Sequence, residues 1–443
     1  MIRYAIALGL AFFAAAAPAY ASCEGNIRTA LDAMARGDDR RGVKNFNADL
    51  LKTHGARNLG QIWAALKEQK GDFRGRGASA WHVIGGRRYL FTDMTFAKGA
   101  YAALDACDAK GKIGFFEWGP VSDAATKIAG AKSVTEPDGV HQQPMTVPSA
   151  WGPLPATLTL PKGDGPFPAV VLVAGAGGND QDESIGPNKP FRDLALGLAR
   201  AGVASLRYDK SITAYPSQAG LSRRLTVDDE VTNDALRALK LLSTQKQIDP
   251  ALVFLLGHSL GAMMAPRIAL RAADVAGIVM MGAPSLSILQ NGIRQTTYLA
   301  SVGHTPEATL KKQLDSLRDE EALLASHVDA PLPPGDYQGM PQSWWMSLYL
   351  YDDVVAAKAV TQPMLIVQGG GDFQVSPADN FVRWQSVFAG DPRVTLKQYP
   401  GLSHIFMPAG NPPSPEDYAK PSHMDPQVIA DIAQWIRGQQ ARK

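Results

Sequence analysis

The five residues Gly257-His258-Ser259-Leu260-Gly261 have the Gly-x-Ser-x-Gly pattern of a serine nucleophile on a sharp turn. The apolar run ALVFLL precedes them, and the helix-compatible run LGAMMAPRIALRAA follows. A strand, a tight turn and a helix in this order lift the serine hydroxyl clear of a sheet, and glycines avoid clashes in the turn. Because so short a pattern also arises by chance, Ser259 needs a base and an acid in suitable places.

Two of the eight histidines lie where a hydrolase with the chain order Ser, acid, His places its base. His404 lies just past the strand-like run VTLKQYP, and His423 precedes the last helical segment. Doubly wound folds bind ligands at the carboxyl ends of their strands. His404 is therefore the predicted base, and His423 is the alternative.

The acid should come from another strand end between Ser259 and the base. Asp372 fits this position directly, because it follows the apolar run in PMLIVQGGGD. Asp379 comes a turn or two later, and Asp391 precedes the next strand, at the wrong end of a parallel sheet. Asp372 is predicted to hold the imidazole in the tautomer that accepts the serine proton.

A glycine-rich stretch, AGAGGNDQD at 174–182, follows the apolar run PAVVLV. Such a loop brings backbone NH groups close to an oxyanion, and Ala176 and Leu260 are the predicted donors. A phosphate-binding loop is the competing interpretation, but the third glycine of G-x-G-x-x-G is missing and no helix follows at once. No His, Asp or Glu cluster has metal-ligand spacing, so neither a metal nor a cofactor is expected.

The elements that must position these residues occupy 149–443. Short, nearly continuous apolar runs alternate there with helical segments, which predicts an α/β fold with a doubly wound, mostly parallel sheet buried on both faces. Residues 286–360 are far too long for a normal strand connection, so they are predicted to form an inserted helical subdomain. Trp344 and Trp345 within it are expected to line an acyl pocket, although aromatic residues at helical spacing also build cores.

The first part of the chain has a different pattern. Residues 22–120 begin with helical periodicity and continue with strands that flank glycine turns, which predicts a small α+β domain. Residues 121–148 are rich in Ser, Thr, Gly, Pro and Gln and are expected to form a linker.

Residues 1–21 combine Arg3, an apolar stretch and the cleavage-like Ala19-Tyr20-Ala21, which is typical of a secretory signal. A secreted or periplasmic protein without a later membrane span is expected. A membrane anchor and a lipid-modified Cys23 are the alternatives. Whether Cys23 pairs with Cys107 is left open by the sequence. The formal net charge of +2, less one unit without Arg3, argues against nucleic acid or an anionic membrane as a partner.

The second domain also resembles the α/β-hydrolase superfamily, most closely bacterial secreted esterases of the dienelactone hydrolase and acyl-CoA thioester hydrolase type. The resemblance is carried by IGPNKPFRDLALGLARAGVASLRYDK, GHSLGAMMAPRIA, QGGGDFQV and YPGLSHIF. It implies the triad Ser259, Asp372 and His404. The chain departs from many relatives in having Ala174-Gly175 where they have His-Gly. Trp63, GDF and GKIGFFEWGP resemble an accessory domain of unknown function that precedes such hydrolases.

These patterns together predict a secreted serine carboxylesterase that hydrolyses short-chain acyl esters without a cofactor. A thioesterase, a lactone hydrolase or a peptidase with the same triad is the first alternative. A binding protein on a hydrolase fold that has lost catalysis is the second, and the complete triad argues against it.

Overall fold

The computed structural model describes residues 17–84, 86–222 and 224–439 of the 443-residue chain. These residues form two compact units. Unit 1 contains the described residues up to 122 together with 216–222, and unit 2 contains those of 123–215 and the remainder. Most of the expected signal, residues 1–16, lies outside the described residues, and 17–21 belong to the first helix.

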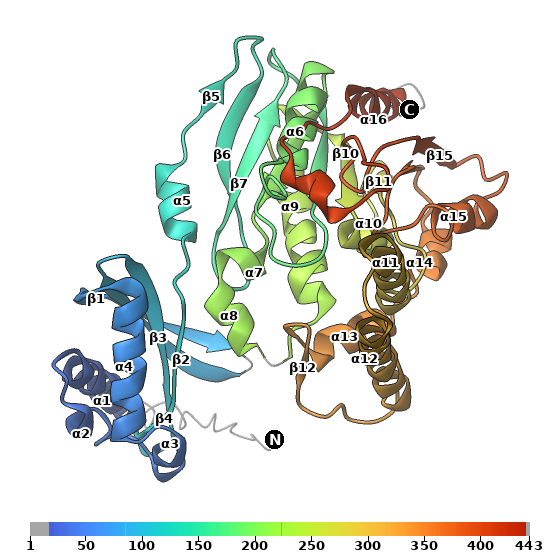
Figure 1. Ribbon diagram of the computed structural model, residues 1–443. Helices are drawn as coiled ribbons and strands as arrows, with labels where there is room; N and C mark the ends of the chain where they lie inside the picture. The colour runs from blue at the N-terminus through green and yellow to red at the C-terminus, as the bar shows by residue number, and fades with distance from the viewer. Residues whose placement is uncertain (1–16, 85, 223, 440–443) are drawn as a thin grey trace, which may run out of the picture. The chain divides into compact units, whose positions relative to one another are not determined.

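Unit 1 is the predicted small α+β domain. Its helices are α1 (Ala17–Ala35), α2 (Asp39–Gly42), α3 (Ala48–Thr53) and α4 (Ala56–Lys70), and its strands are β1 (Phe73–Ile84), β2 (Arg87–Phe96), β3 (Gly99–Cys107) and β4 (Ile113–Pro120). The strands form an antiparallel meander in the order β1-β2-β3-β4 (Figure 1). Ile27 and Trp63 from the helices pack with Met94 and Phe116 from the sheet in one buried cluster.

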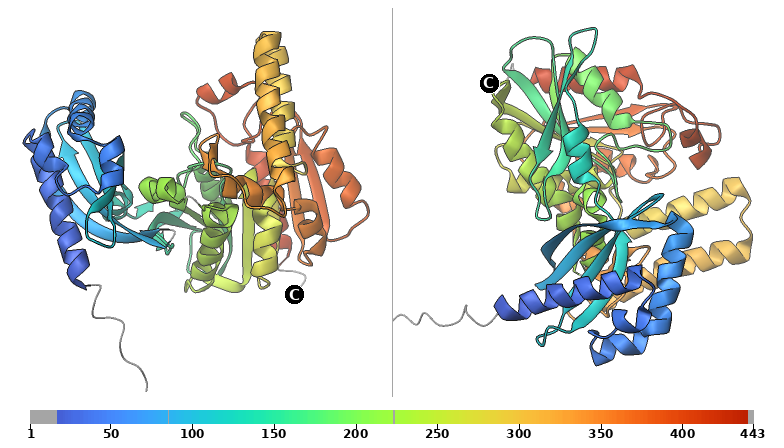
Figure 2. Two further views of the ribbon diagram at one scale, coloured as in Figure 1. Left: turned by 90° about the horizontal axis from the view of Figure 1, so that it is seen from below. Right: turned by 90° about the vertical axis from the view of Figure 1, so that its left-hand side faces the viewer.

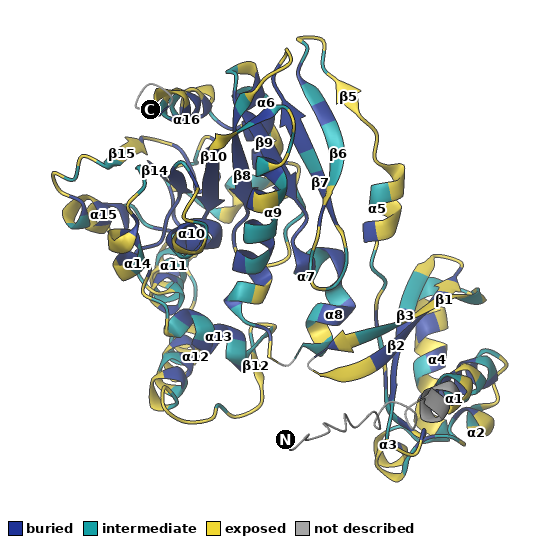
Figure 3. Ribbon diagram, turned by 180° about the vertical axis from the view of Figure 1, so that it is seen from behind, coloured by how far each residue is buried: buried dark blue, intermediate teal, exposed yellow. Residues whose placement is uncertain are grey.

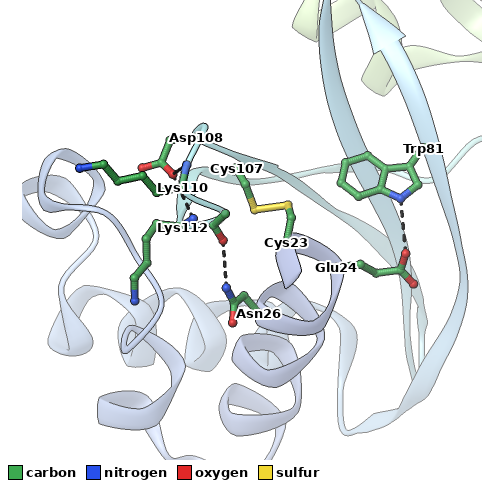
Figure 4. Close-up of a disulfide and its surroundings, with 9 residues drawn as sticks. Cys23, Glu24, Asn26, Trp81, Cys107, Asp108, Lys110 and Lys112 are labelled. Atoms are coloured by element: carbon green, nitrogen blue, oxygen red, sulfur yellow. Dashed lines mark hydrogen bonds between the residues drawn. A yellow bond between two sulfur atoms is a disulfide. The ribbon is translucent and has the colours of Figure 1, made fainter. Parts of the chain in front are cut away.

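A disulfide ties the first helix to this sheet. It joins Cys23 on α1 to Cys107 at the end of β3, as Figure 4 shows. Beside it, the Asn26 side chain donates a hydrogen bond to the carbonyl oxygen of Gly111 at 2.9 Å. A cross-link between residues so far apart in the chain stabilises a fold by an amount on the order of 4 kcal/mol.

Unit 2 contains a nine-stranded sheet in the order β15-β14-β11-β10-β8-β9-β7-β6-β5. The strands are β5 (Val134–Thr135), β6 (His141–Val147), β7 (Leu154–Leu160), β8 (Phe167–Val173), β9 (Ala204–Tyr208), β10 (Ile248–His258), β11 (Ile278–Met281), β14 (Met364–Gly369) and β15 (Val394–Tyr399). Pairing is parallel from β15 to β9 and antiparallel from β9 to β5. The central strands are buried, as Figure 3 shows, which agrees with their continuous apolar sequences and confirms the predicted fold class.

Helices cover both faces of this sheet. On one face α9 (Asn233–Ser243) and α10 (Leu260–Arg271) share a core with Val171 and Leu255. On the other, α6 (Pro190–Arg200) and α16 (Pro426–Gly438) share a core with Val170 and Phe254. Further helical segments of this unit outside the insertion include α7 (Ser211–Ala214), η1 (Asp228–Thr232), α15 (Phe381–Val387) and η2 (Pro415–Ala419).

Two stretches differ from the expected domain plan. Most of the expected linker, 121–148, is structured: α5 (Ala124–Gly130) is followed by β5 and β6, and β6 pairs along its length with β7. Its polar sequence reflects a place near the sheet edge, where only part of a strand is buried and Pro144 is tolerated. Helix α8 (Pro216–Leu221), expected in the second domain, belongs to unit 1, where Leu221 packs against an apolar cluster and the Ser217 hydroxyl donates to Pro120 O at 2.7 Å.

Residues 286–360, called the cap, leave the sheet after β11 and return at β14. They contain α11 (Ile288–Gly303), α12 (Glu307–Ser326), β12 (Asp336–Tyr337), β13 (Met340–Pro341), α13 (Gln342–Tyr349) and α14 (Asp353–Ala359). Helices α11 and α12 lie side by side in Figure 2. Ile278 of β11 pairs directly with Met364 of β14, so the cap starts and ends at neighbouring strands. Across the described part of the chain, no helix combines the length and apolar character needed to cross a membrane.

Candidate active site

Ser259 lies at the turn between β10 and α10 with φ 53° and ψ −119°. Positive φ is uncommon for a residue with a side chain and is characteristic of functional turns. The turn has no room for side chains on either flank. A Cβ at Gly257 would lie 2.1 Å from Gly261 O, and one at Gly261 would lie 2.2 Å from Val173 O. The local sequence therefore produces the sharp turn that its glycines predict.

His404 and Asp372 form a buried hydrogen-bonded pair. His404 Nδ1 donates to Asp372 Oδ2 at 2.7 Å, and the two residues are 3% and 4% exposed. Asp372 Oδ2 also accepts from the Gln368 side chain at 2.8 Å. Its Oδ1 accepts from the backbone NH groups of Gln374 at 2.9 Å and Val375 at 2.8 Å. These donors fix the orientation of the carboxylate toward the imidazole.

The pair lies beside the Ser259 turn. Ser259 N donates to Met281 O at 2.9 Å, and a Cβ at the next residue, Gly282, would lie 3.1 Å from the His404 ring. Ser259, Asp372 and His404 follow β10, β14 and β15, so all three occupy the carboxyl edge of the parallel strands. The Ser259 hydroxyl makes no hydrogen bond to any residue that the structure describes. It is available to a substrate.

The alternative residues lie in other surroundings. The His423 side chain is 89% exposed, with Nδ1 3.1 Å from Asp193. Asp379 pairs with Arg294 at 2.9 Å. Asp391 pairs with its neighbour Arg393 and so does not reach an imidazole.

The two predicted oxyanion donors face the same cavity as Ser259. Ala176 and Leu260 line this cavity, and a Cβ at Gly175 would lie 3.1 Å from Ser259 Cβ, so the glycine-rich loop lies close to the serine. Within residues 17–84, 86–222 and 224–439, no hydrogen bond uses the NH of Ala176 or Leu260. Both groups are thus free to donate to a bound oxygen.

A buried ion pair holds the glycine-rich loop in position. Lys210 Nζ lies 2.7 Å from Glu230 Oε1, and the two side chains are 3% and 0% exposed. Lys210 Nζ also donates to the carbonyl oxygens of Gly175 and Gly177, and Gly177 N donates to Glu230 Oε1 at 3.0 Å. The second oxygen of Glu230 accepts from Trp344 Nε1 in the cap. No pattern in the sequence identifies Glu230 as the partner of Lys210.

A second buried pair joins the loop to His404. Glu183 Oε1 accepts from Gly175 N at 2.6 Å and from His258 Nδ1 at 2.8 Å. The other ring nitrogen of His258 lies 2.9 Å from His404 O. Burial alone would lower the pKa of His258, but the charge and hydrogen bond of Glu183 raise it above its ordinary value. Both ring nitrogens face oxygen acceptors, an arrangement that favours the protonated form of His258.

The cavity at Ser259 has a volume of about 450 Å³. Trp344, Trp345, Leu289 and Leu317 give it an apolar wall. Both tryptophans are also buried in the core of unit 2, at 3% and 6% exposure, so each contributes to packing and to the wall. Among the residues described, no group of three or more His, Cys, Asp or Glu side chains is arranged to hold a metal ion.

Comparison with known proteins places this chain in a family. A family model described as serine aminopeptidase, S33, matches residues 188–408. Esterase EstD of Thermotoga maritima is 36% identical over 388 residues, which cover 86% of this chain and 87% of the relative.

Two solved structures resemble the chain more distantly. Est1E from Butyrivibrio proteoclasticus has a TM-score of 0.42 at 13% identity and covers 67% of this chain and 99% of its own. A hyperthermophilic esterase from the archaeon Pyrobaculum calidifontis has a TM-score of 0.43 at 14% identity and covers 72% and 90%. The family assignment therefore comes from the Thermotoga relative, whose similarity spans both units: the chain belongs to the α/β-hydrolase esterases.

Proposed function

We propose that this esterase is a secreted serine carboxylesterase that hydrolyses short-chain acyl esters, with Ser259, His404 and Asp372 as its triad. The observation that carries the proposal is the buried His404–Asp372 hydrogen bond beside a serine with positive φ that lines a cavity. A serine in a sharp turn next to an oriented imidazole is the arrangement required for acyl transfer.

In the proposed reaction, Ser259 Oγ attacks the ester carbonyl carbon while His404 Nε2 takes its proton. The NH groups of Ala176 and Leu260 donate to the oxyanion. His404 then gives the proton to the departing alcohol oxygen, and Asp372 stabilises the imidazolium meanwhile. A water molecule, activated by the same histidine, releases the acyl group as a carboxylic acid.

The preference for short acyl chains is proposed from the size and walls of the cavity. Each methylene that leaves water for the apolar wall contributes about 0.8 kcal/mol at most, which is a few-fold in kcat/KM. Trp344 and Trp345 close the cavity on the cap side. The rate should therefore rise with chain length until the cavity is full and then fall.

Secretion is proposed from the signal-like residues 1–21 and from the disulfide between Cys23 and Cys107. Disulfides persist in oxidising compartments such as the bacterial periplasm. Amino-terminal sequencing of the mature protein should begin at Ser22. A mature protein that still began at Met1 would contradict this part of the proposal.

The triad is tested by labelling with a fluorophosphonate probe and by the variant Ser259→Ala. The wild-type protein should be labelled, and the variant should lose labelling and at least about three orders of magnitude in kcat. A variant with more than about a tenth of the wild-type activity would refute the assignment of Ser259 as nucleophile.

A second candidate is aminoacyl amide hydrolysis, because the matching family model is described for serine aminopeptidases. A panel of acyl esters, thioesters, lactones and aminoacyl amides with the same enzyme preparation separates the two candidates. The ester should have the highest kcat/KM.

A further inference from the structure

A second cavity, of about 880 Å³, borders the proposed active site. One side is formed by α11, which presents Gln290, Arg294 and Thr297 to it. The neighbouring residues Leu289 and Thr296 of the same helix line the cavity at Ser259 instead. Helix α11 therefore separates two cavities, each of which uses a different side of the helix.

The two cavities adjoin at Gln374, which lines both. Gln374 belongs to the loop after β14, and this loop also contributes Asp372 and Phe373 to the second cavity. The Gln374 position is fixed, because its NH donates to Asp372 Oδ1 at 2.9 Å and its side chain donates to Tyr418 at 2.9 Å. The second cavity thus lies against the loop that orients His404.

The chemistry of acyl transfer assigns a direction to each half of the ester. His404 must protonate the alcohol oxygen as it leaves, so the alcohol has to extend toward His404 and the loop that holds it. The acyl chain then extends toward the apolar wall at Trp344 and Trp345. An alcohol that passes Gln374 enters the second cavity.

The walls of the second cavity differ in chemistry from those of the first. They carry the amides of Gln290 and Gln374 and the hydroxyls of Thr297, Ser301 and Ser376. Arg294 forms an ion pair with Asp379 at 2.9 Å, which balances its positive charge. The cavity therefore offers hydrogen-bond donors and acceptors without the excess of positive charge that would favour an anionic ligand.

Aromatic rings supply the apolar part of the same walls. Tyr298 and Phe373 both line the cavity, and their rings stack with centroids 6.3 Å apart and an interplanar angle of 17°. A sugar ring has a rim of hydroxyl groups and flat faces of C–H bonds. Amides, hydroxyls and aromatic surface together match both parts of such a ring.

We propose that the second cavity binds the alcohol half of the ester, and that this alcohol is a neutral sugar. The inference rests on the proposed function, since it needs His404 as the proton donor. In the reaction, the bond between the acyl carbon and the sugar oxygen breaks, and the electron pair stays on that oxygen. The oxygen takes the proton that His404 received from Ser259, and hydrolysis of the acyl-enzyme yields a carboxylic acid.

The test holds the acyl group constant and varies the alcohol. Hydrolysis of a monoacetylated hexose is compared with hydrolysis of ethyl acetate by the full-length enzyme. The sugar acetate should have a kcat/KM at least about ten-fold higher, because the groups of the second cavity find partners only on the sugar.

Two adjacent residues of α11 give a matched pair of variants. Thr297→Trp places a bulky ring in the second cavity and narrows it, so the ratio of kcat/KM for the sugar acetate over ethyl acetate should fall at least about five-fold. Thr296→Trp narrows the cavity at Ser259, so it should alter the preference between acetate and butyrate esters while that ratio stays within about two-fold. The melting temperature of each variant shows whether it is folded.

The possible results distinguish the inference from the proposed function. The sugar site alone is overturned if the wild-type enzyme hydrolyses ethyl acetate but does not prefer the sugar acetate. It is also overturned if Thr297→Trp leaves the ratio of kcat/KM for the sugar acetate over ethyl acetate unchanged. Ethyl acetate hydrolysis that survives Ser259→Ala overturns the proposed function instead. Loss of the sugar preference in Thr297→Trp but not in Thr296→Trp supports the inference.

Discussion

Removal of one partner of the buried Lys210–Glu230 pair is a stringent test of how the glycine-rich loop is held. In Lys210→Met, the new side chain is of similar length but has no charge and no donor. Glu230 remains fully buried with a hydrogen bond from Gly177 N and one from Trp344 Nε1. Two carbonyl oxygens, of Gly175 and Gly177, lose a donor.

The expected loss is about 3 to 5 kcal/mol in the free energy of unfolding of unit 2. Most of this loss is the desolvation of a carboxylate that no longer has a nearby cation. The attraction within the intact pair is a smaller quantity, because it is largely offset by the burial of both charges. The double variant Lys210→Met with Glu230→Gln, which buries no charge, should therefore recover a large part of the loss.

Chemical unfolding of the wild type, the two single variants and the double variant measures this coupling. Lys189→Met is the control, since its ion pair with Asp182 is about half exposed on the lysine side and should contribute about 0 to 1 kcal/mol. A loss of stability in Lys210→Met no larger than in this control would contradict the predicted role of the buried pair. Single-variant losses that add within about 0.5 kcal/mol in the double variant would contradict it as well.

Three further predictions concern other sites. In a kinetic assay, His404→Ala should abolish esterase activity, whereas His423→Ala should retain it. If His423→Ala abolished the activity and His404→Ala retained it, His423 would be the base instead. Burial, with a smaller contribution from the charge of Asp352, raises the pKa of Asp353 to about 7. The folded chain therefore holds this proton more tightly than the unfolded chain, and stability is lost as pH rises from about 4 to about 7. Asp353→Asn removes the titrating group, so it should weaken this loss of stability at high pH. Relative to wild type, it should raise the melting temperature at pH 8 and raise it much less at pH 4. Equal changes in melting temperature at the two pH values would contradict the raised pKa of Asp353. Trp345→Ala should enlarge the cavity at Ser259, so that longer acyl chains are hydrolysed well. A lower melting temperature with an unchanged preference for acyl-chain length would show that this tryptophan has a packing role only.

Local patterns in the sequence were sufficient to predict the parts of the molecule whose structure depends on residues close together in the chain. The strand, turn and helix around Ser259 lie within residues 248–271, and the two glycines identify the turn. Asp372 and His404 were found in the same way, because each lies a few residues after the end of a predicted strand. A parallel sheet brings such strand ends to one edge whatever their distance in sequence.

The residues that were missed act through contacts between distant segments. Glu230 is one of three consecutive acidic residues in DDE, and nothing in that run shows which one is buried. Glu183 lies in the polar stretch after the glycine-rich loop, and only the fold brings it to His258. The strand β6 lies in the predicted linker because its place near the sheet edge leaves part of its surface in water, so its sequence lacks a continuous apolar run.

The pairing of Ile278 with Met364 has a consequence for how such an enzyme changes during evolution. The cap is an excursion between two strands that stay neighbours, so its replacement by a different length of chain alters neither the register of the sheet nor the loops that carry Asp372 and His404. The cost of closing a longer excursion grows only slowly with its length. A new cap must still supply a donor to the buried Glu230 oxygen that Trp344 now satisfies. Substrate range can therefore diversify by exchange of one segment, as long as the new segment replaces the hydrogen bonds that the cap now makes to the rest of the unit, such as those of Trp344 and Asn291.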